Sequence, residues 1–103
     1  MNPGDFVLSA KGRDKGKIFI VVGREDEEYV LLCDGQIRKA DKPKRKKTKH
    51  TVELDAADLF IAEKIANGGR ATNNELRKAI SSFRSAQIEA EGKEEYPWPK
   101  TTS

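Results

Sequence analysis

Residues 4–23 read GDFVLSAKGRDKGKIFIVVG, which is two short apolar runs on either side of a charged turn. The run over 5–10 follows a Pro-Gly breaker and predicts a first strand. Residues 11–16 contain two glycines and four charged side chains, so they predict a turn in which glycine supplies positive φ. The β-branched and aromatic run over 17–23 predicts a second strand, buried on both faces for part of its length.

The pattern continues with two more expected strands. Charged residues 24–27 predict a turn, and residues 28–33 predict a third strand. The Asp-Gly dipeptide at 34–35 is favoured in tight type I′ hairpin turns, and residues 36–39 then make a fourth strand. Four short strands joined by tight turns predict a small, strongly curved antiparallel β-barrel over residues 1–40.

A strongly basic segment follows the predicted barrel. Between Arg38 and Lys49 the chain has eight basic residues against one acid, whereas the whole chain carries a net charge of only +3. The positive charge is therefore local, and the rest of the chain is net acidic. Residues 41–52 offer too little apolar surface to bury, so we expect an extended, solvated linker there. Its cations repel one another, and contact with a polyphosphate offsets that repulsion by releasing counterions.

Helical periodicity begins in residues 53–88. The first expected helix has Asp55 as its N-cap and ends at the glycine pair 68–69. The second begins at Thr72, where Glu75 completes a capping-box pattern. The apolar positions of the two helices are Leu54, Ala57, Ile61, Ile65, Leu76, Ala79, Ile80 and Phe83. We expect a helical hairpin that buries these positions against each other, against the barrel or against a partner.

The expected fold class is therefore mainly β with an α appendage, that is, α+β. Only 36% of the residues are hydrophobic, which is low for a compact domain and indicates that part of the chain is not packed. The acidic residues 89–103, which include Tyr96 and Trp98, are the segment we expect to be disordered.

The sequence contains no pattern that predicts catalysis, a metal or a membrane span. A single cysteine, Cys33, and a single histidine, His50, are too few for a structural zinc site or an intramolecular disulfide. Phosphate-loop, HExxH and nucleophile-elbow motifs are absent. No 18-residue apolar stretch occurs, and the N-terminal residues lack the features of a signal peptide. We expect a cytoplasmic protein that is not an enzyme and has no cofactor.

Residues 4–7, 9–17 and 18–22 together resemble the KOW motif, an RNA-associated segment of ribosomal proteins and NusG-type transcription factors. The hallmark glycine of that motif matches Gly16, which has Lys15 and Lys17 on either side. The whole layout is similar to small bacterial KOW-domain RNA-binding proteins that resemble eukaryotic-type large-subunit ribosomal proteins. The resemblance implies an SH3-like barrel and binding to RNA, ribosomal RNA in particular, and it is looser after residue 51.

The charges support the same role independently of the resemblance. Gly16 leaves room for a phosphate to approach the backbone, and the guanidinium of Arg13 can bind a phosphate or a base in bidentate fashion. The predicted RNA-binding residues are Lys11, Arg13, Lys15, Gly16, Lys17, Arg38, Lys39, Lys42, Lys44, Arg45, Lys46, Lys47 and Lys49. Because most of these side chains suit phosphates, we expect salt-sensitive binding with weak sequence specificity.

Two alternatives to RNA binding remain open from the sequence. The protein is a protein-interaction module if the barrel or the helical hairpin docks a ribosomal or transcription-factor partner. It is a double-stranded DNA binder if the basic residues prefer that polymer, because counterion release does not distinguish the two nucleic acids. In each case we expect a monomer in the free state.

Overall fold

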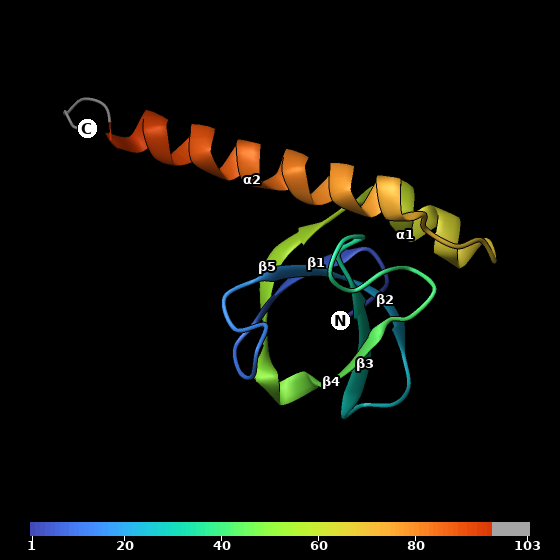
Figure 1. The fold of residues 1–103 in the computed structure, drawn as a ribbon. Helices are drawn as coiled ribbons and strands as arrows, with labels where there is room; N and C mark the ends of the chain where they lie inside the picture. The colour runs from blue at the N-terminus through green and yellow to red at the C-terminus, as the bar shows by residue number, and fades with distance from the viewer. Residues whose placement is uncertain (96–103) are drawn as a thin grey trace.

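The computed structural model describes residues 1–95 of the chain, with the side chains described as far as Ile88. The fold is α+β, with a five-stranded antiparallel sheet followed by two helices (Figure 1). The elements are β1 (Asp5–Ser9), β2 (Ile18–Arg24), β3 (Tyr29–Cys33), β4 (Lys44–Lys47), the 3-10 turn η1 (Thr48–His50), β5 (Thr51–Ala57), α1 (Leu59–Ala66) and α2 (Asn73–Glu95). The three strands predicted over 5–10, 17–23 and 28–33 are confirmed to within one residue at each end.

The sheet curls into an incomplete ring (Figure 1). Its strand order is β4-β3-β2-β1-β5, so β4 and β5 are the two edges. The expected closed barrel is therefore wrong for the part of the chain that the structure describes. The reason is the corner at η1, after which β5 pairs with β1 and not with β4.

The sheet buries side chains on both faces, as the continuous apolar run of β2 predicts. On one face Phe6, Ile20 and Cys33 pack against residues of α1 and α2. On the inner face of the curl a second cluster consists of Val7, Phe19, Val21, Val30 and Leu32, with Met1 against it. Alternation along β1 and β2 explains the two clusters, because successive side chains of a strand point to opposite faces.

The basic segment is not the extended linker that its composition predicts. Residues 44–47 form β4, whose backbone pairs with β3 in a register that places Lys46 opposite Val30. A lysine-rich strand is stable at a sheet edge because only the backbone needs a partner there, while the cationic side chains stay solvated. The linker prediction for 41–52 and the helix predicted from residue 53 are both wrong, because residues 51–57 form β5.

The expected fourth strand over 36–39 is also wrong. These residues belong to a loop between β3 and β4, in which the carboxylate of Asp34 accepts hydrogen bonds from the backbone N–H groups of Gln36 (2.9 Å) and Arg38 (2.8 Å). Such aspartate-centred turns compete with strand pairing. Gly35 has φ +80°, so glycine is needed there, although not for a two-residue hairpin.

Helix α1 begins after Asp58, not Asp55, and the Asp58 carboxylate accepts a hydrogen bond from the N–H of Ile61 at 2.9 Å. The capping box of α2 is confirmed. The hydroxyl of Thr72 accepts from the N–H of Glu75 (3.1 Å), and the Glu75 carboxylate accepts from the N–H of Thr72 (2.9 Å). Helix α2 continues to Glu95, so the disorder expected for 89–95 is wrong; Tyr96 and Trp98 lie outside the described residues.

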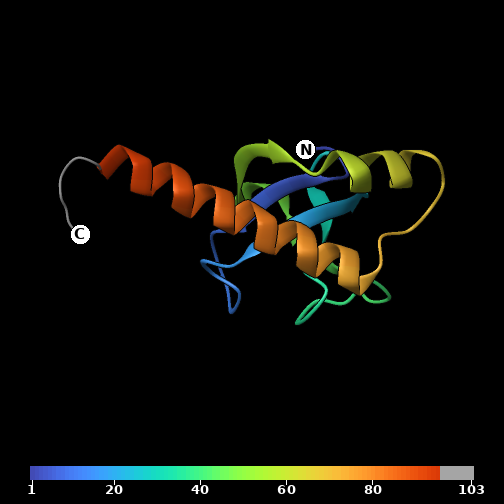
Figure 2. The ribbon, with the colours of Figure 1, turned by 90° about the horizontal axis from the view of Figure 1, so that it is seen from above.

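Both helices lie across the outer face of the sheet rather than forming an isolated hairpin (Figure 2). The Phe6 ring of β1 stacks on the Phe83 ring of α2 with 4.4 Å between centroids. An ion pair of 2.9 Å between Lys64 and Glu75 joins the two helices. Among residues 1–95 no helix is long and apolar enough to cross a lipid bilayer.

Candidate nucleic-acid interface

The β1–β2 turn, residues 10–17, is held to the β3–β4 loop by a partly buried ion pair. The guanidinium of Arg38 donates two hydrogen bonds to one carboxylate oxygen of Asp14, from Nε (3.1 Å) and Nη2 (2.9 Å). Only 6% of Asp14 is exposed. A buried carboxylate needs such a partner, so Arg38 has a structural role in addition to any ligand contact. The sequence-based view of Asp14 as a counterweight in the turn missed this role.

A second contact brings strand β4 to the same turn. The Lys46 ammonium donates a hydrogen bond to the backbone carbonyl of Lys11 at 2.5 Å. Gly12 lies directly below, since a Cβ there would be 3.4 Å from Lys46 Nζ. The two basic segments, which are separate in the sequence, are therefore adjacent in space. We call them together, with the β3–β4 loop, the basic surface: residues 11–17, 38–42 and 44–49.

Arg45 has local partners on the other side of β4. Its Nε donates to a carboxylate oxygen of Glu25 at 2.6 Å, and its guanidinium carbon lies 3.6 Å from the centroid of the Tyr29 ring. The hydrogen bond to Glu25 is the main cause that raises the pKa of Arg45. This side chain therefore marks the border between the basic surface and the acidic β2–β3 turn, residues 25–28.

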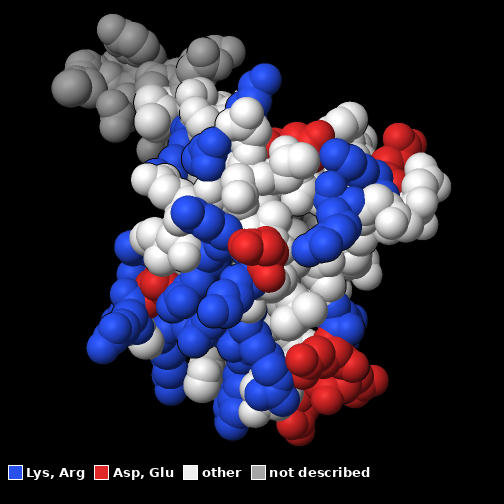
Figure 3. All heavy atoms as spheres, turned by 45° about the vertical axis from the view of Figure 1, so that its right-hand side comes forward, with Lys and Arg blue, Asp and Glu red and all other residues white. Residues whose placement is uncertain are grey.

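The remaining cations of the basic surface are available to a ligand. Within residues 1–95 the following predicted RNA-binding side chains are exposed and form no ion pair: Lys11, Arg13, Lys15, Lys17, Lys39, Lys42, Lys47 and Lys49. Figure 3 shows Lys and Arg side chains gathered in one broad band on this face, beside a smaller group of Asp and Glu side chains. Lys44 is partly buried, and Gly16 is exposed with φ +87°.

His50 senses the positive potential of this surface. The pKa of its imidazole is lowered from the usual 6.5, first by desolvation and then by Lys11, Lys49, Lys47 and Lys46. One of these lysines belongs to the turn and the others to β4 and η1. Their joint effect on one imidazole indicates a shared electrostatic field rather than two separate basic patches.

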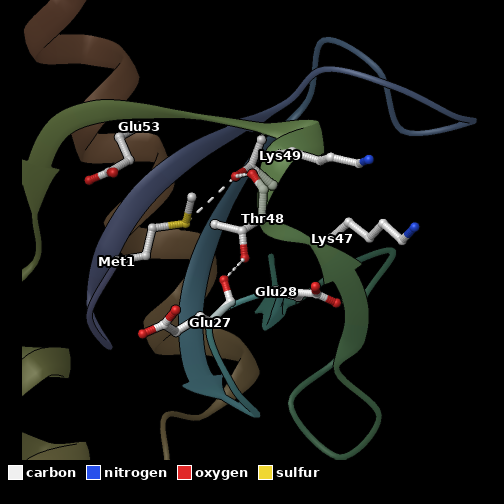
Figure 4. Close-up of a pocket in the computed structure, with 8 residues that line it drawn as sticks. Met1, Glu27, Glu28, Lys47, Thr48, Lys49 and Glu53 are labelled. Atoms are coloured by element: carbon white, nitrogen blue, oxygen red, sulfur yellow. Dashed lines mark hydrogen bonds between the residues drawn. The ribbon is translucent and has the colours of Figure 1, made fainter.

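A cavity of about 520 Å³ opens beside η1 (Figure 4). Met1 lies across it, and Glu27, Glu28 and Glu53 contribute carboxylates to its lining. Lys47 and Lys49 also line it, but their ammonium groups point together away from the labelled glutamates. Three carboxylates make this cavity unfavourable for a polyanion, so we place it at the border of the basic surface and not at its centre.

The two groups that sequence reasoning considered for zinc or thiol chemistry are far from forming a reactive site. Burial is the main cause that raises the pKa of the Cys33 thiol to about 11, and the Sγ lies 3.4 Å from the carbonyl oxygen of Lys39. A thiol with so high a pKa carries little thiolate near neutral pH. No group of three or more potential metal ligands occurs in the described part of the chain.

Two cations near the basic surface were missed from the sequence. Arg77 and Arg84 lie on α2, and no acid interrupts the helix between residues 76 and 88. The Arg77 guanidinium donates to the carbonyl of Gly35 (2.7 Å) and to the side chain of Asn74 (2.6 Å). The signal for them was the absence of acids in this stretch, which was interpreted only for its apolar stripe.

Comparison with known proteins adds no assignment. No protein-family model matches the chain, and no curated protein is significantly similar to it. The case for this surface is therefore made by its geometry: an ion pair, a lysine–carbonyl hydrogen bond and a shared electrostatic field.

Proposed function

We propose that this protein binds structured RNA, ribosomal RNA in particular, through phosphate contacts made by the basic surface. The observation that carries the proposal is the convergence of the turn and β4, which Lys46 joins through the Lys11 carbonyl. It concentrates exposed, unpaired cations on one face of a chain whose net charge is only +3. Clustered lysines with free ammonium groups are suited to phosphates, because each contact releases condensed counterions.

The KOW resemblance supports the same proposal from the sequence side. Gly16 is in the left-handed region with open space around it, as expected for a turn that a phosphate approaches closely. On this proposal the curled sheet is an SH3-like KOW domain in which the turn and the η1 corner face the ligand. The proposed role is binding, with no catalytic step.

Salt dependence tests the proposal directly. We expect the logarithm of the affinity for a ribosomal RNA fragment to fall linearly with the logarithm of salt concentration, with a slope of about −4 for roughly five phosphates neutralised. Duplex DNA of the same length serves as competitor. In parallel, the protein should sediment with large ribosomal subunits and leave them after RNase or at high salt. A salt-independent affinity, or retention on the subunits after RNase digestion, would contradict phosphate-based RNA binding.

The single histidine gives a residue-level test of the same contact. We expect the pKa of His50 to rise when RNA binds, because phosphates neutralise the lysines that lower it in the free protein. An NMR titration of the one imidazole between pH 5 and 8, with and without RNA, measures the change. As a control, Lys49→Gln should raise the pKa in the free protein. A pKa that is unchanged or lower in the complex would place the RNA elsewhere.

Protein docking remains the second candidate function, although not through the predicted stripe. Ile61, Leu76 and Ile80 are buried against the sheet, so that part of the stripe offers no free surface. Two neighbouring residues of α1 favour the alternative: Leu59 is 78% exposed and Phe60 is 61% exposed. An association that survives nuclease and high salt but is lost in Leu59→Ser/Phe60→Ser would support it.

A further inference from the structure

A groove of about 470 Å³ runs between α2 and the loops at the edge of the basic surface. In Figure 2, α2 crosses the sheet, and the β1–β2 turn and the β3–β4 loop project on the same side. The helix contributes side chains at three- and four-residue spacing, so a single face of it forms one wall. The lining residues are Lys17, Ile18, Asp34, Gln36, Ile37, Arg77, Ile80, Ser81, Arg84, Ser85 and Ile88.

The groove is positively charged and joins the basic surface through Lys17, which belongs to both. Arg77 is fixed by its hydrogen bond to the Gly35 carbonyl, whereas Arg84 is exposed and forms no ion pair within residues 1–95. The one acid in the lining, Asp34, already accepts hydrogen bonds from backbone N–H groups of its own loop. Three cations against one occupied carboxylate favour an anionic ligand.

The groove also has apolar walls that remain in contact with solvent. Ile37 of the loop is 50% exposed and Ile88 of α2 is 67% exposed, on either side of the charged positions. The hydroxyls of Ser81 and Ser85 are exposed between them. Apolar side chains have no use for a paired duplex, whose bases are stacked inside, but they can contact the face of an unstacked base or a ribose.

We propose that this groove binds unpaired nucleotides, from a bulge or a loop, of the RNA whose helical part lies on the basic surface. Arg84 and Lys17 contact the phosphates, Ile37 and Ile88 contact the base or the ribose, and the serine hydroxyls lie within reach of a 2′-hydroxyl. The groove thereby supplies a preference for RNA structure that phosphate contacts alone do not give. The inference rests on the proposed RNA binding and adds the class of RNA to it.

The test compares two RNA hairpins that differ only in a bulge of three unpaired nucleotides in the stem. We expect the protein to bind the bulged hairpin about ten-fold more tightly at about 100 mM salt, as for one base stacked with 1–3 kcal/mol. The variant Arg84→Gln/Ile88→Ser should reduce this preference to less than about two-fold. Both side chains are exposed, so the fold should survive, and a thermal melt checks this.

Lys78→Gln is the matched control, because Lys78 is exposed on α2 and lies outside the groove. It removes the same charge as Arg84→Gln and should leave the preference unchanged. In addition, 4-thiouridine placed in the bulge should crosslink to peptides containing residues 34–37 or 77–88, and 4-thiouridine in the paired stem should not.

The outcomes separate the two proposals. Equal affinities of the natural protein for both hairpins, or a preference that persists in Arg84→Gln/Ile88→Ser, would overturn the groove assignment while RNA binding stands. No binding to either hairpin at low salt would overturn the proposed function, and the groove assignment with it. If the groove variant loses a protein partner instead, while its RNA affinities match those of the natural protein, the groove is a protein-docking site.

Discussion

Replacing four lysines of the basic surface by glutamine should weaken binding to structured RNA by roughly 100-fold or more at about 100 mM salt. The four are Lys15, Lys42, Lys47 and Lys49, all exposed and free of ion pairs within residues 1–95. An exposed charge pair contributes up to about 1 kcal/mol, so four lost phosphate contacts account for a loss of this size. The slope of log affinity against log salt should become shallower by about 3, close to one unit per phosphate lost.

The choice of these lysines follows from the contacts within β4. Arg45 pairs with Glu25 and Lys46 with the Lys11 carbonyl, so replacing them disturbs the fold as well as the charge. A double variant, Lys47→Gln/Lys49→Gln, can be compared with Arg24→Gln/Lys78→Gln, which changes the net charge equally but lies outside the basic surface. Equal losses of affinity in the two doubles would mean that net charge, and not this surface, determines RNA binding.

The first half of the sheet was predictable because its signal comes from burial. In β2 every residue from Ile18 to Val22 is apolar, since one face packs on the helices and the other lies inside the curl. Such a run fits few structures other than a buried strand. The turn between β1 and β2 was predictable for a related reason, since Gly12 and Gly16 both require positive φ.

The second half of the sheet was not predictable from the same kind of pattern. Strand β4 consists of four basic residues and is held by backbone pairing with β3, which leaves no trace in side-chain periodicity. In β5, Leu54 and Ala57 match helical spacing by coincidence, and only tertiary pairing with β1 makes the segment extended. The basic residues of the site were predicted from composition, but their convergence depends on Arg38–Asp14 and Lys46–Lys11, which join residues 24 and 35 positions apart in the sequence.

The largest stability effect should come from Gly35, a glycine in the β3–β4 loop. It has φ +80°, and a Cβ there would clash with the backbone carbonyl oxygen of Asn73 in α2. We expect Gly35→Ala to lower the free energy of unfolding by about 3 kcal/mol or more, since left-handed strain and overpacking each cost about 1–3 kcal/mol. For a domain of this size that corresponds to a fall in melting temperature of at least about 12 °C.

Gly68→Ala is the matched control for this prediction. Gly68 has φ +87°, but no other atom lies within 4 Å of the place that a Cβ would occupy, so this variant carries the backbone strain without the clash. Its expected cost is about 1–2 kcal/mol. If Gly35→Ala does not fold, Asn73→Ala tests the same contact more gently, because it removes the acceptor of the Ala40 N–H, a bond of 2.7 Å, at an expected cost of about 1 kcal/mol.

The same variants connect the helix to the proposed RNA site. The start of α2 holds the β3–β4 loop through Asn73 to Ala40 and Arg77 to Gly35, and that loop carries Arg38 to Asp14 in the β1–β2 turn. Loosening the first contacts should therefore weaken RNA binding even though neither Gly35 nor Asn73 is charged. We expect Asn73→Ala to lower RNA affinity several-fold at a temperature where it is fully folded, with an unchanged salt slope. Natural-protein affinity in that variant would show that the basic surface is held in place without α2.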